Sequence, residues 1–190
     1  PRCNVKLVGF LPGLTTLLGV SHQAIDDLAI LRALPNMTLI EPSGPEQMRA
    51  AVRAAADHHG PVYLRMKRAE ARPQTQVPLV IGRGQVVREV MGSSAGVIFA
   101  CGLMVQAALE AAATLAAQGI EVAVVNLPTI KPLDCELVTQ MARRSRCVVT
   151  AENHTILGGL GSAVAETLME AGVHVGFARV GIRDTFAEGG

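Results

Sequence analysis

The chain has 190 residues, of which 49% are hydrophobic and 3% aromatic, and a formal net charge of +1. This charge, without a basic run, argues against nucleic acid as a partner, and no apolar run reaches the ~20 residues that span a bilayer. An aliphatic composition is typical of helices packed on a buried parallel sheet. Four scattered cysteines without metal-ligand spacing, and no visible signal peptide, predict reduced thiols in a cytoplasmic protein.

The first 68 residues predict a strand–helix–strand unit. After an initial strand at 5–8 and a glycine-punctuated loop, Ser21 is predicted to cap a helix that carries Asp26 and Asp27 in its first turn. Strands are then predicted at 37–42 and 62–66, on either side of a helix that runs to about Asp57. The spacing S-x-x-E at the start of this helix, from Ser43, predicts a capping box. Strands at this spacing are expected to be parallel with a right-handed crossover.

A polar stretch with two prolines, residues 69–78, predicts a linker between two domains. Beyond it, strands and helices alternate strictly and predict an open, doubly wound, mostly parallel sheet. The predicted strands cover 96–102, 120–127, 146–153 and 174–181, and the helices 104–118, 134–144 and 160–171. Neither end of the chain resembles a natural terminus, so we expect the sequence to be a piece of a longer polypeptide.

Two motifs in the second half have both a functional and a structural interpretation. The glycines of Gly158–Val164 lie between a strand and a helix, where they could cradle a phosphate or simply allow close helix–sheet packing. Glu152 and His154 end a strand, where open sheets place their ligands. They could take part in acid–base chemistry, hold the next loop or lie at a subunit interface.

A third group combines His22 with the basic residues Arg65, Lys67 and Arg68. The carboxyl ends of parallel strands meet at one edge of a sheet, so these side chains could share a crevice. An imidazole with arginines suits a phosphorylated sugar, because a guanidinium gives two bonds to phosphate oxygens. The alternative for His22 is a solvated residue at the start of a helix. A histidine at that positive end is expected to be neutral.

Several segments together resemble the transketolase family. They are SHQAIDDLAILRALPNMTLIEPSGPEQM (21–48), GPVYLRMKR (60–68), the stretch from Ala100 to Asp134, TAENHTILGGLGSAVAE (150–166) and DTFAEGG (184–190). The resemblance covers essentially the whole chain, in order. It implies the end of the pyrimidine-binding domain at 1–68, a linker at 69–78 and the transketolase C-terminal domain at 79–190.

This resemblance implies a transferase that moves a two-carbon ketol unit between sugar phosphates with thiamine diphosphate and Mg²⁺, as in pentose phosphate metabolism. His22 matches the family's substrate-side catalytic histidine and Arg68 its phosphate-binding arginine, with Arg65 as a further phosphate-binding candidate. The main cofactor-binding and metal-binding residues of the family would precede Pro1. We therefore expect the fragment to be inactive alone, and expect a homodimer or a separate N-terminal subunit.

Two departures from the family concern the substrate. Leu17 and Leu18 stand where the family commonly has an acidic loop, and Phe10 or Leu11 stands near the place of a further histidine. A less polar pocket predicts an unusual or altered donor. Three alternatives remain: a deoxyxylulose-phosphate synthase, the beta subunit of a 2-oxo acid dehydrogenase, and a module for dimerisation or ligand binding without chemistry.

Overall fold

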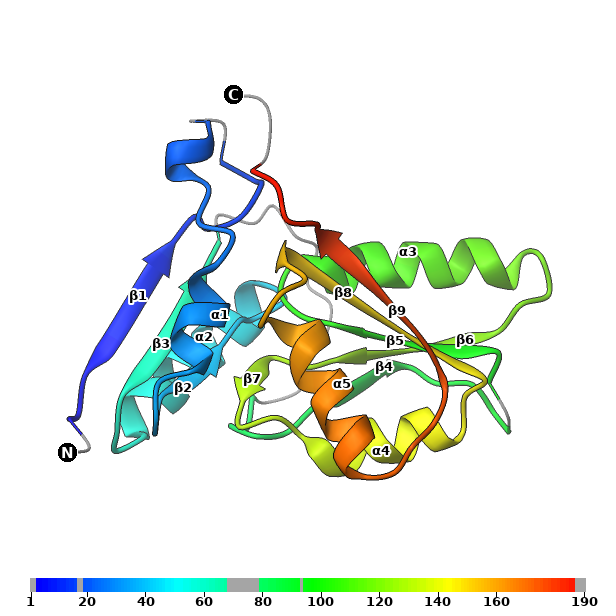
Figure 1. Cartoon of the computed structure of the whole chain (residues 1–190). Coiled ribbons are helices and arrows are strands. Elements are labelled where there is room, and N and C mark those ends of the chain that lie inside the picture. Colours follow the sequence, from blue (N-terminus) through cyan, green and yellow to red (C-terminus); the bar gives the residue numbers. More distant parts are fainter. Residues whose placement is uncertain (1–2, 17–18, 68–78, 93, 187–190) are drawn as a thin grey trace.

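Two α/β units lie side by side, each built on its own sheet (Figure 1). The computed structural model describes residues 3–16, 19–67, 79–92 and 94–186. The predicted fold class, an α/β chain with a βαβ segment followed by an open, mostly parallel doubly wound sheet, is confirmed. The predicted linker at 69–78 lies outside the described residues.

The first sheet has the order β1-β3-β2-β7. Its strands are β1 Lys6–Phe10, β2 Thr38–Ile40, β3 Val62–Met66 and β7 Thr129–Lys131. β3 pairs in parallel with β1 and with β2, as predicted. β7 comes from the second half of the chain and pairs antiparallel with β2, so the two units share a strand across the predicted domain division. The helices of this unit are α1 Asp27–Arg32 and α2 Pro45–Asp57.

The second sheet has the order β4-β6-β5-β8-β9. Its strands are β4 Gln85–Arg88, β5 Gly96–Ala100, β6 Val122–Asn126, β8 Cys147–Thr155 and β9 Gly176–Ile182, and its helices are α3 Met104–Ala116, α4 Cys135–Arg143 and α5 Leu160–Glu170. Helix α3 covers one face, and α4 and α5 cover the other (Figure 1). The antiparallel edge strand β4 was not predicted, because four partly exposed residues carry no clear pattern.

The predicted start of the first helix is wrong. Val20–His22 forms a short 3-10 helix, η1, and α1 begins only at Asp27, with Asp26 in the N-cap position and no side-chain cap. The intervening residues bond elsewhere: the carbonyl of Ile25 accepts from the N–H of Thr155, at 2.7 Å. This tertiary contact overrides the local helical pattern.

The predicted capping box at α2 is also wrong. Gly44 occupies the N-cap position, and no side chain caps it. The Ser43 hydroxyl donates to Oε1 of Gln47 at 3.0 Å, and Glu46 pairs with Arg49. Gln47 is buried, and its Oε1 accepts a hydrogen bond from Nδ2 of Asn126 at 3.2 Å. Packing against the second unit therefore decides how this helix begins.

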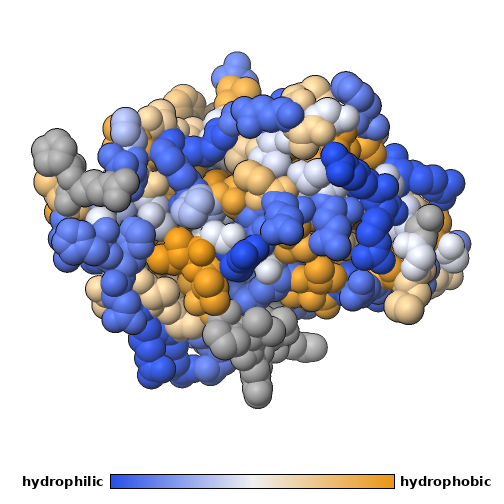
Figure 2. Space-filling view, turned by 90° about the horizontal axis from the view of Figure 1, so that it is seen from below, coloured by the Kyte–Doolittle hydropathy of each residue, from blue (hydrophilic) through white to orange (hydrophobic). Residues whose placement is uncertain are grey.

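The surface alternates in character. On the face in Figure 2, hydrophobic side chains gather in separate patches among hydrophilic ones. Within the described residues, none of the helices has both the length and the apolar character needed to cross a membrane.

Candidate functional site

The carboxyl ends of strands from both sheets meet where the two units touch. We call the polar residues that gather there the seam cluster: Glu41, Arg65, Asn153 and His154, which are buried, and Asp27, which is partly buried. Backbone bonds join the units at this place: the N–H of Glu41 donates to the carbonyl of Pro128 at 2.8 Å. Gly102 makes the approach possible, because a Cβ there would lie 2.4 Å from Oε1 of Glu41.

Arg65 is the centre of the seam cluster. Its side chain is 0% exposed. Its Nε donates to Oδ2 of Asp27 at 2.8 Å, and its Nη1 to Oε1 of Glu41 at 2.8 Å. The carbonyls of Asn153 and Ala24 accept further bonds, at 3.2 and 3.1 Å. Arg65 was predicted to bind substrate phosphate. In the structure its guanidinium bonds to buried groups of the protein, so phosphate binding by Arg65 would require the seam cluster to open.

The charges in the seam cluster stabilise one another. Burial alone would raise the pKa of Asp27, but the hydrogen bond and charge of Arg65 outweigh it and hold that pKa below its ordinary value. Glu41 behaves in the same way: burial is opposed by the charges of Arg65 and Lys67, and its pKa is lowered. Tyr63 donates to Oδ2 of Asp27 at 2.5 Å, and burial together with this bond raises the tyrosine pKa.

Glu152 occupies the start of helix α5. Its two carboxylate oxygens accept from the N–H groups of Leu160 at 2.7 Å and Gly161 at 2.9 Å. A Cβ at Gly159 would lie 2.0 Å from one of these oxygens. The glycines therefore allow close packing, and the phosphate cradle is excluded because a carboxylate already fills it. Burial raises the pKa of Glu152 to about 7, despite the two backbone bonds.

His154 is buried against the first unit. Its Nδ1 lies 2.7 Å from the carbonyl oxygen of Thr155, and its Nε2 lies 3.8 Å from Oδ1 of Asp27. Burial lowers its pKa, which favours the neutral ring. The Glu152 and His154 side chains lie 3.7 Å apart, but both are buried in the protein. These contacts support the structural interpretation, and an acid–base role remains a prediction.

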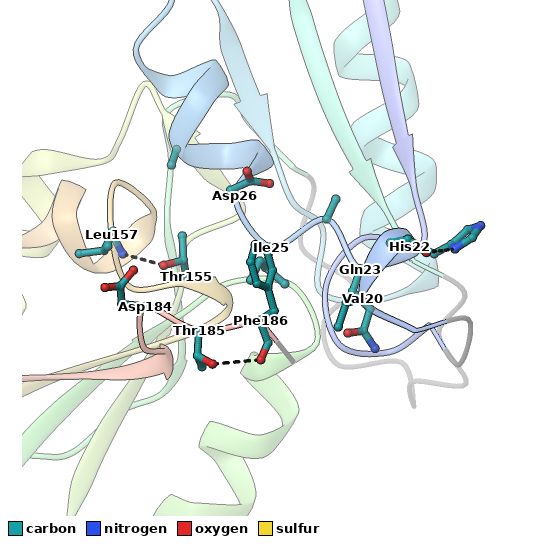
Figure 3. Close-up of a pocket in the computed structure, with 13 residues that line it drawn as sticks. Val20, His22, Gln23, Ile25, Asp26, Thr155, Leu157, Asp184, Thr185 and Phe186 are labelled. Atoms are coloured by element: carbon teal, nitrogen blue, oxygen red, sulfur yellow. Dashed lines mark hydrogen bonds between the residues drawn. The ribbon is translucent and has the colours of Figure 1, made fainter. Parts of the chain in front are cut away.

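An open cleft of about 840 Å³ lies between the η1–α1 segment and the ends of β8 and β9. We call it the His22 cleft. Polar side chains of Asp26, Thr155 and Asp184 line it together with the exposed ring of Phe186 (Figure 3). Acidic groups and an imidazole around an open, partly apolar cleft are suited to a molecule with several hydroxyl groups.

His22 lies at the rim of this cleft, on η1. It is exposed, and its Nδ1 lies 3.1 Å from Oγ of Ser21. The ring points away from the side formed by Asp184 and Phe186 (Figure 3). Since α1 begins five residues later, the argument that the helix end keeps His22 neutral is wrong.

The structure separates residues that the sequence grouped together. His22 lines the open cleft, whereas Arg65 lies in the seam cluster and Lys67 lines another pocket. Arg68 lies outside the described residues. The roles of Glu41 and Asp27 in the seam cluster were not predicted from the sequence. The position of Glu41 at the end of a strand was an available signal, but its partners come from distant parts of the chain.

No group of three or more His, Cys, Asp or Glu side chains is placed to hold a metal ion in the part of the chain that the structure describes.

Comparison with known proteins supplies the family. Residues 2–74 match the transketolase pyrimidine-binding domain, and residues 82–190 match the transketolase C-terminal domain. A transketolase family protein of Sinorhizobium fredii is 43% identical over 98% of this chain and 55% of its own length. A 6-deoxy-6-sulfo-D-fructose transketolase subunit of a Clostridium species is 44% identical over 98% of this chain and 58% of its own length.

Two further matches are a relative with a different named reaction and a solved structure. A 1-deoxy-D-xylulose-5-phosphate synthase of Geobacter sulfurreducens is 41% identical over 90% of this chain, but over 27% of its own length. The solved structure of a split-gene transketolase, described as an inactive β4 tetramer, is 43% identical, with a TM-score of 0.88 over 97% of this chain and 59% of that one. The chain thus spans little more than half the length of the transketolase relatives named here.

Proposed function

The chain belongs to the transketolase family, and from this premise we propose that it is the C-terminal subunit, or C-terminal section, of an enzyme that transfers a two-carbon ketol unit between sugar phosphates. The observation that carries the proposal is the similarity to split transketolase subunits, which covers 97–98% of this chain at 43–44% identity. Two matches that cover nearly all of this chain favour a subunit role over a module without chemistry.

The cofactor would be held mainly by the rest of the enzyme. Members of the family generally depend on thiamine diphosphate, which supplies a carbanion nucleophile when bound. The resemblance to the family implies that the residues that bind Mg²⁺ and the diphosphate lie outside these 190 residues, so we assign both to a preceding section or to a partner subunit. The inactive β4 tetramer of the 43% identical split-gene protein supports the need for such a partner.

The contribution of this chain would be substrate binding in the His22 cleft. The His22 imidazole would donate a hydrogen bond to a hydroxyl or carbonyl oxygen of the sugar, and Arg68 would bind its phosphate. Asp26 and Asp184 line the same cleft, and their carboxylates can accept bonds from sugar hydroxyls. Because the cleft is open, substrate can reach these groups without disturbing the buried seam cluster.

Two observations bear on the donor. Leu17 and Leu18 replace an acidic loop of the family, and one 44% identical relative is a subunit that acts on a sulfonated sugar. A sulfonate is a terminal anion of about the same shape as a phosphate. We therefore include a 6-deoxy-6-sulfoketose among the donors. The 41% identity to a deoxyxylulose-phosphate synthase supports condensation of pyruvate with glyceraldehyde phosphate as a second candidate reaction.

The test uses the complete enzyme, with its N-terminal partner if that is a separate chain, plus thiamine diphosphate and Mg²⁺. Each donor is paired with an aldose phosphate acceptor, and the products are identified. We expect transfer from xylulose 5-phosphate or from the sulfoketose. Release of CO₂ from pyruvate with deoxyxylulose phosphate as product would instead establish the synthase, and no product from any pair would refute both reactions.

A further inference from the structure

A second pocket, of about 320 Å³, lies beside the start of helix α2. It is lined by residues of the β2–α2 turn, by Met48 and Arg49 of α2, by Lys67 after β3, and by Leu103 before α3. We call it the Lys67 pocket. It shares no lining residue with the His22 cleft. Its walls come from both α/β units.

Lys67 brings a buried charge to this pocket. Its side chain is 7% exposed, and its Nζ has no hydrogen-bond partner among the described residues. The nearest carboxylate oxygen, Oε1 of Glu41, is 3.8 Å away and already accepts from Arg65 at 2.8 Å. An ammonium has three donors, and leaving them unsatisfied in a buried place is costly. A ligand in the pocket would relieve this cost.

Helix α2 points its positive end at the same pocket. Gly44, its N-cap residue, and Pro45, its first residue, both line the pocket. The first N–H groups of a helix have no partner within the helix, and the helix dipole favours an anion there. No side chain caps this end. A 13-residue helix without a cap therefore faces the unsatisfied ammonium.

The remaining groups set the charge and shape of the ligand. Arg49 is 66% exposed and pairs with Glu46, so it can add attraction at the pocket mouth while Glu46 limits it. Met48, Leu103, Pro42 and Pro45 give the pocket apolar walls. The volume, at the lower end of ligand pockets, suits an anionic head with a small organic part.

We propose that the Lys67 pocket binds the phosphate group of a small phosphate monoester, with Lys67 as the buried ion-pair partner, the start of α2 as the second anchor and Arg49 at the mouth. The monoester would contact both α/β units at once. Burial lowers the pKa of Lys67 to about 8, against the opposing charge of Glu41. Bound phosphate raises that pKa again, so binding weakens as the pH rises through 8. Arg65, Cys101 and Asp27 are the other titratable groups that act on this ammonium.

The experiment is isothermal titration calorimetry on the complete enzyme with inorganic phosphate, glycerol 3-phosphate and acetate as probes. In the wild-type protein we expect glycerol 3-phosphate to bind more tightly than phosphate, and acetate least. Lys67→Met should weaken the Lys67-pocket component at least about tenfold, the loss expected for one buried charge-assisted bond. Arg49→Gln should weaken it several-fold.

Lys131→Met is the matched control. Its ammonium is bonded to the carbonyls of Arg32 and Leu34, outside the Lys67 pocket, so phosphate binding should be unchanged. Thermal unfolding of each variant checks that the fold is retained, and Arg49→Gln carries the test if Lys67→Met unfolds. Equal affinities for phosphate and glycerol 3-phosphate would identify free phosphate as the ligand and overturn the proposal that the pocket binds a monoester. The same stoichiometry and affinity in wild-type protein and both pocket variants would overturn the site itself.

Discussion

The seam cluster and the His22 cleft use the same kinds of side chain in opposite ways. In the seam cluster, Arg65 and Glu41 are completely buried and paired. In the His22 cleft, His22 and Asp26 are exposed and free of such a network. The difference shows that polar side chains near the carboxyl edge of a sheet can be buried and paired or left open to solvent, and we propose ligand binding only for the open ones.

The largest effect should come from the centre of the seam cluster. Arg65→Met leaves Asp27 and Glu41 buried without their cation, and we expect the free energy of unfolding to fall by about 3–5 kcal/mol. The matched control is Arg49→Met, which removes a 66% exposed partner of Glu46 and should cost less than about 1 kcal/mol. Chemical denaturation of the complete protein measures both. Similar losses for the two variants would refute the distinction between buried and exposed pairs.

A glycine pair tests the close approach at the seam. Gly102 and Gly119 both have positive φ, 55° and 75°, but only Gly102 has neighbours, with Glu41 in the way of a Cβ. Gly119→Ala should cost about 1–2 kcal/mol from the backbone alone. Gly102→Ala should cost about 1–3 kcal/mol more, because Glu41 must move. Urea midpoints of the two variants give the comparison, and equal midpoints would contradict the predicted contact.

A substitution in the His22 cleft should lower activity and leave stability nearly unchanged, the opposite of the effect expected in the seam cluster. His22→Ala should lower kcat/KM for ketol transfer by the complete enzyme at least about tenfold, while the free energy of unfolding changes by less than about 0.5 kcal/mol. His59→Ala, an exposed histidine after α2, is the control and should leave activity unchanged. Loss of stability with intact kinetics would place His22 among structural residues.

The smallest expected effect is on stability at acid pH, through the carboxylate of Asp27. The folded pKa of Asp27 lies below its ordinary value of 3.8, so its stabilising contribution is present above that value and is lost as the pH falls through the folded pKa. The unfolding midpoint should therefore fall more steeply below about pH 4 in wild-type protein than in Asp27→Asn. Asp26→Asn, which removes the neighbouring exposed carboxylate, serves as control. A wild-type slope in Asp27→Asn would show that Asp27 is not the group responsible.

Sequence patterns predicted the regular elements well and their edges poorly. Helices α3, Met104–Ala116, and α5, Leu160–Glu170, lie within the ranges predicted for them, 104–118 and 160–171. The short strands β4 and β7 were not predicted, because three or four residues carry too little pattern and their pairing partners are distant in the chain. Both capping predictions failed at places where a tertiary bond forms: the carbonyl of Ile25 accepts from Thr155, and Oε1 of Gln47 accepts from Asn126.

The candidate site was predictable in part. The segment around His22 was recognisable from its residues, and the structure places that histidine at an open cleft. The structure places His22 at the open cleft and buries Arg65, which lies within β3, so the predicted grouping of the two stays a prediction. The backbone carbonyl of Asn153, in the second unit, accepts a bond from Arg65, whose carboxylate partners Asp27 and Glu41 belong to its own unit. A pattern along one strand contains no information about that contact.

The α/β class, the family resemblance and the order of the predicted elements could be inferred from the residues alone, because they depend on local periodicity and on residues close together in the chain. Which charges are structural depends on contacts between distant parts of the chain. Glu41, Arg65 and Asn153 meet across 24 and 88 positions of sequence. Their burial and pairing depend on how the two sheets meet, since a charge is stable in the interior only when partners from both units arrive together.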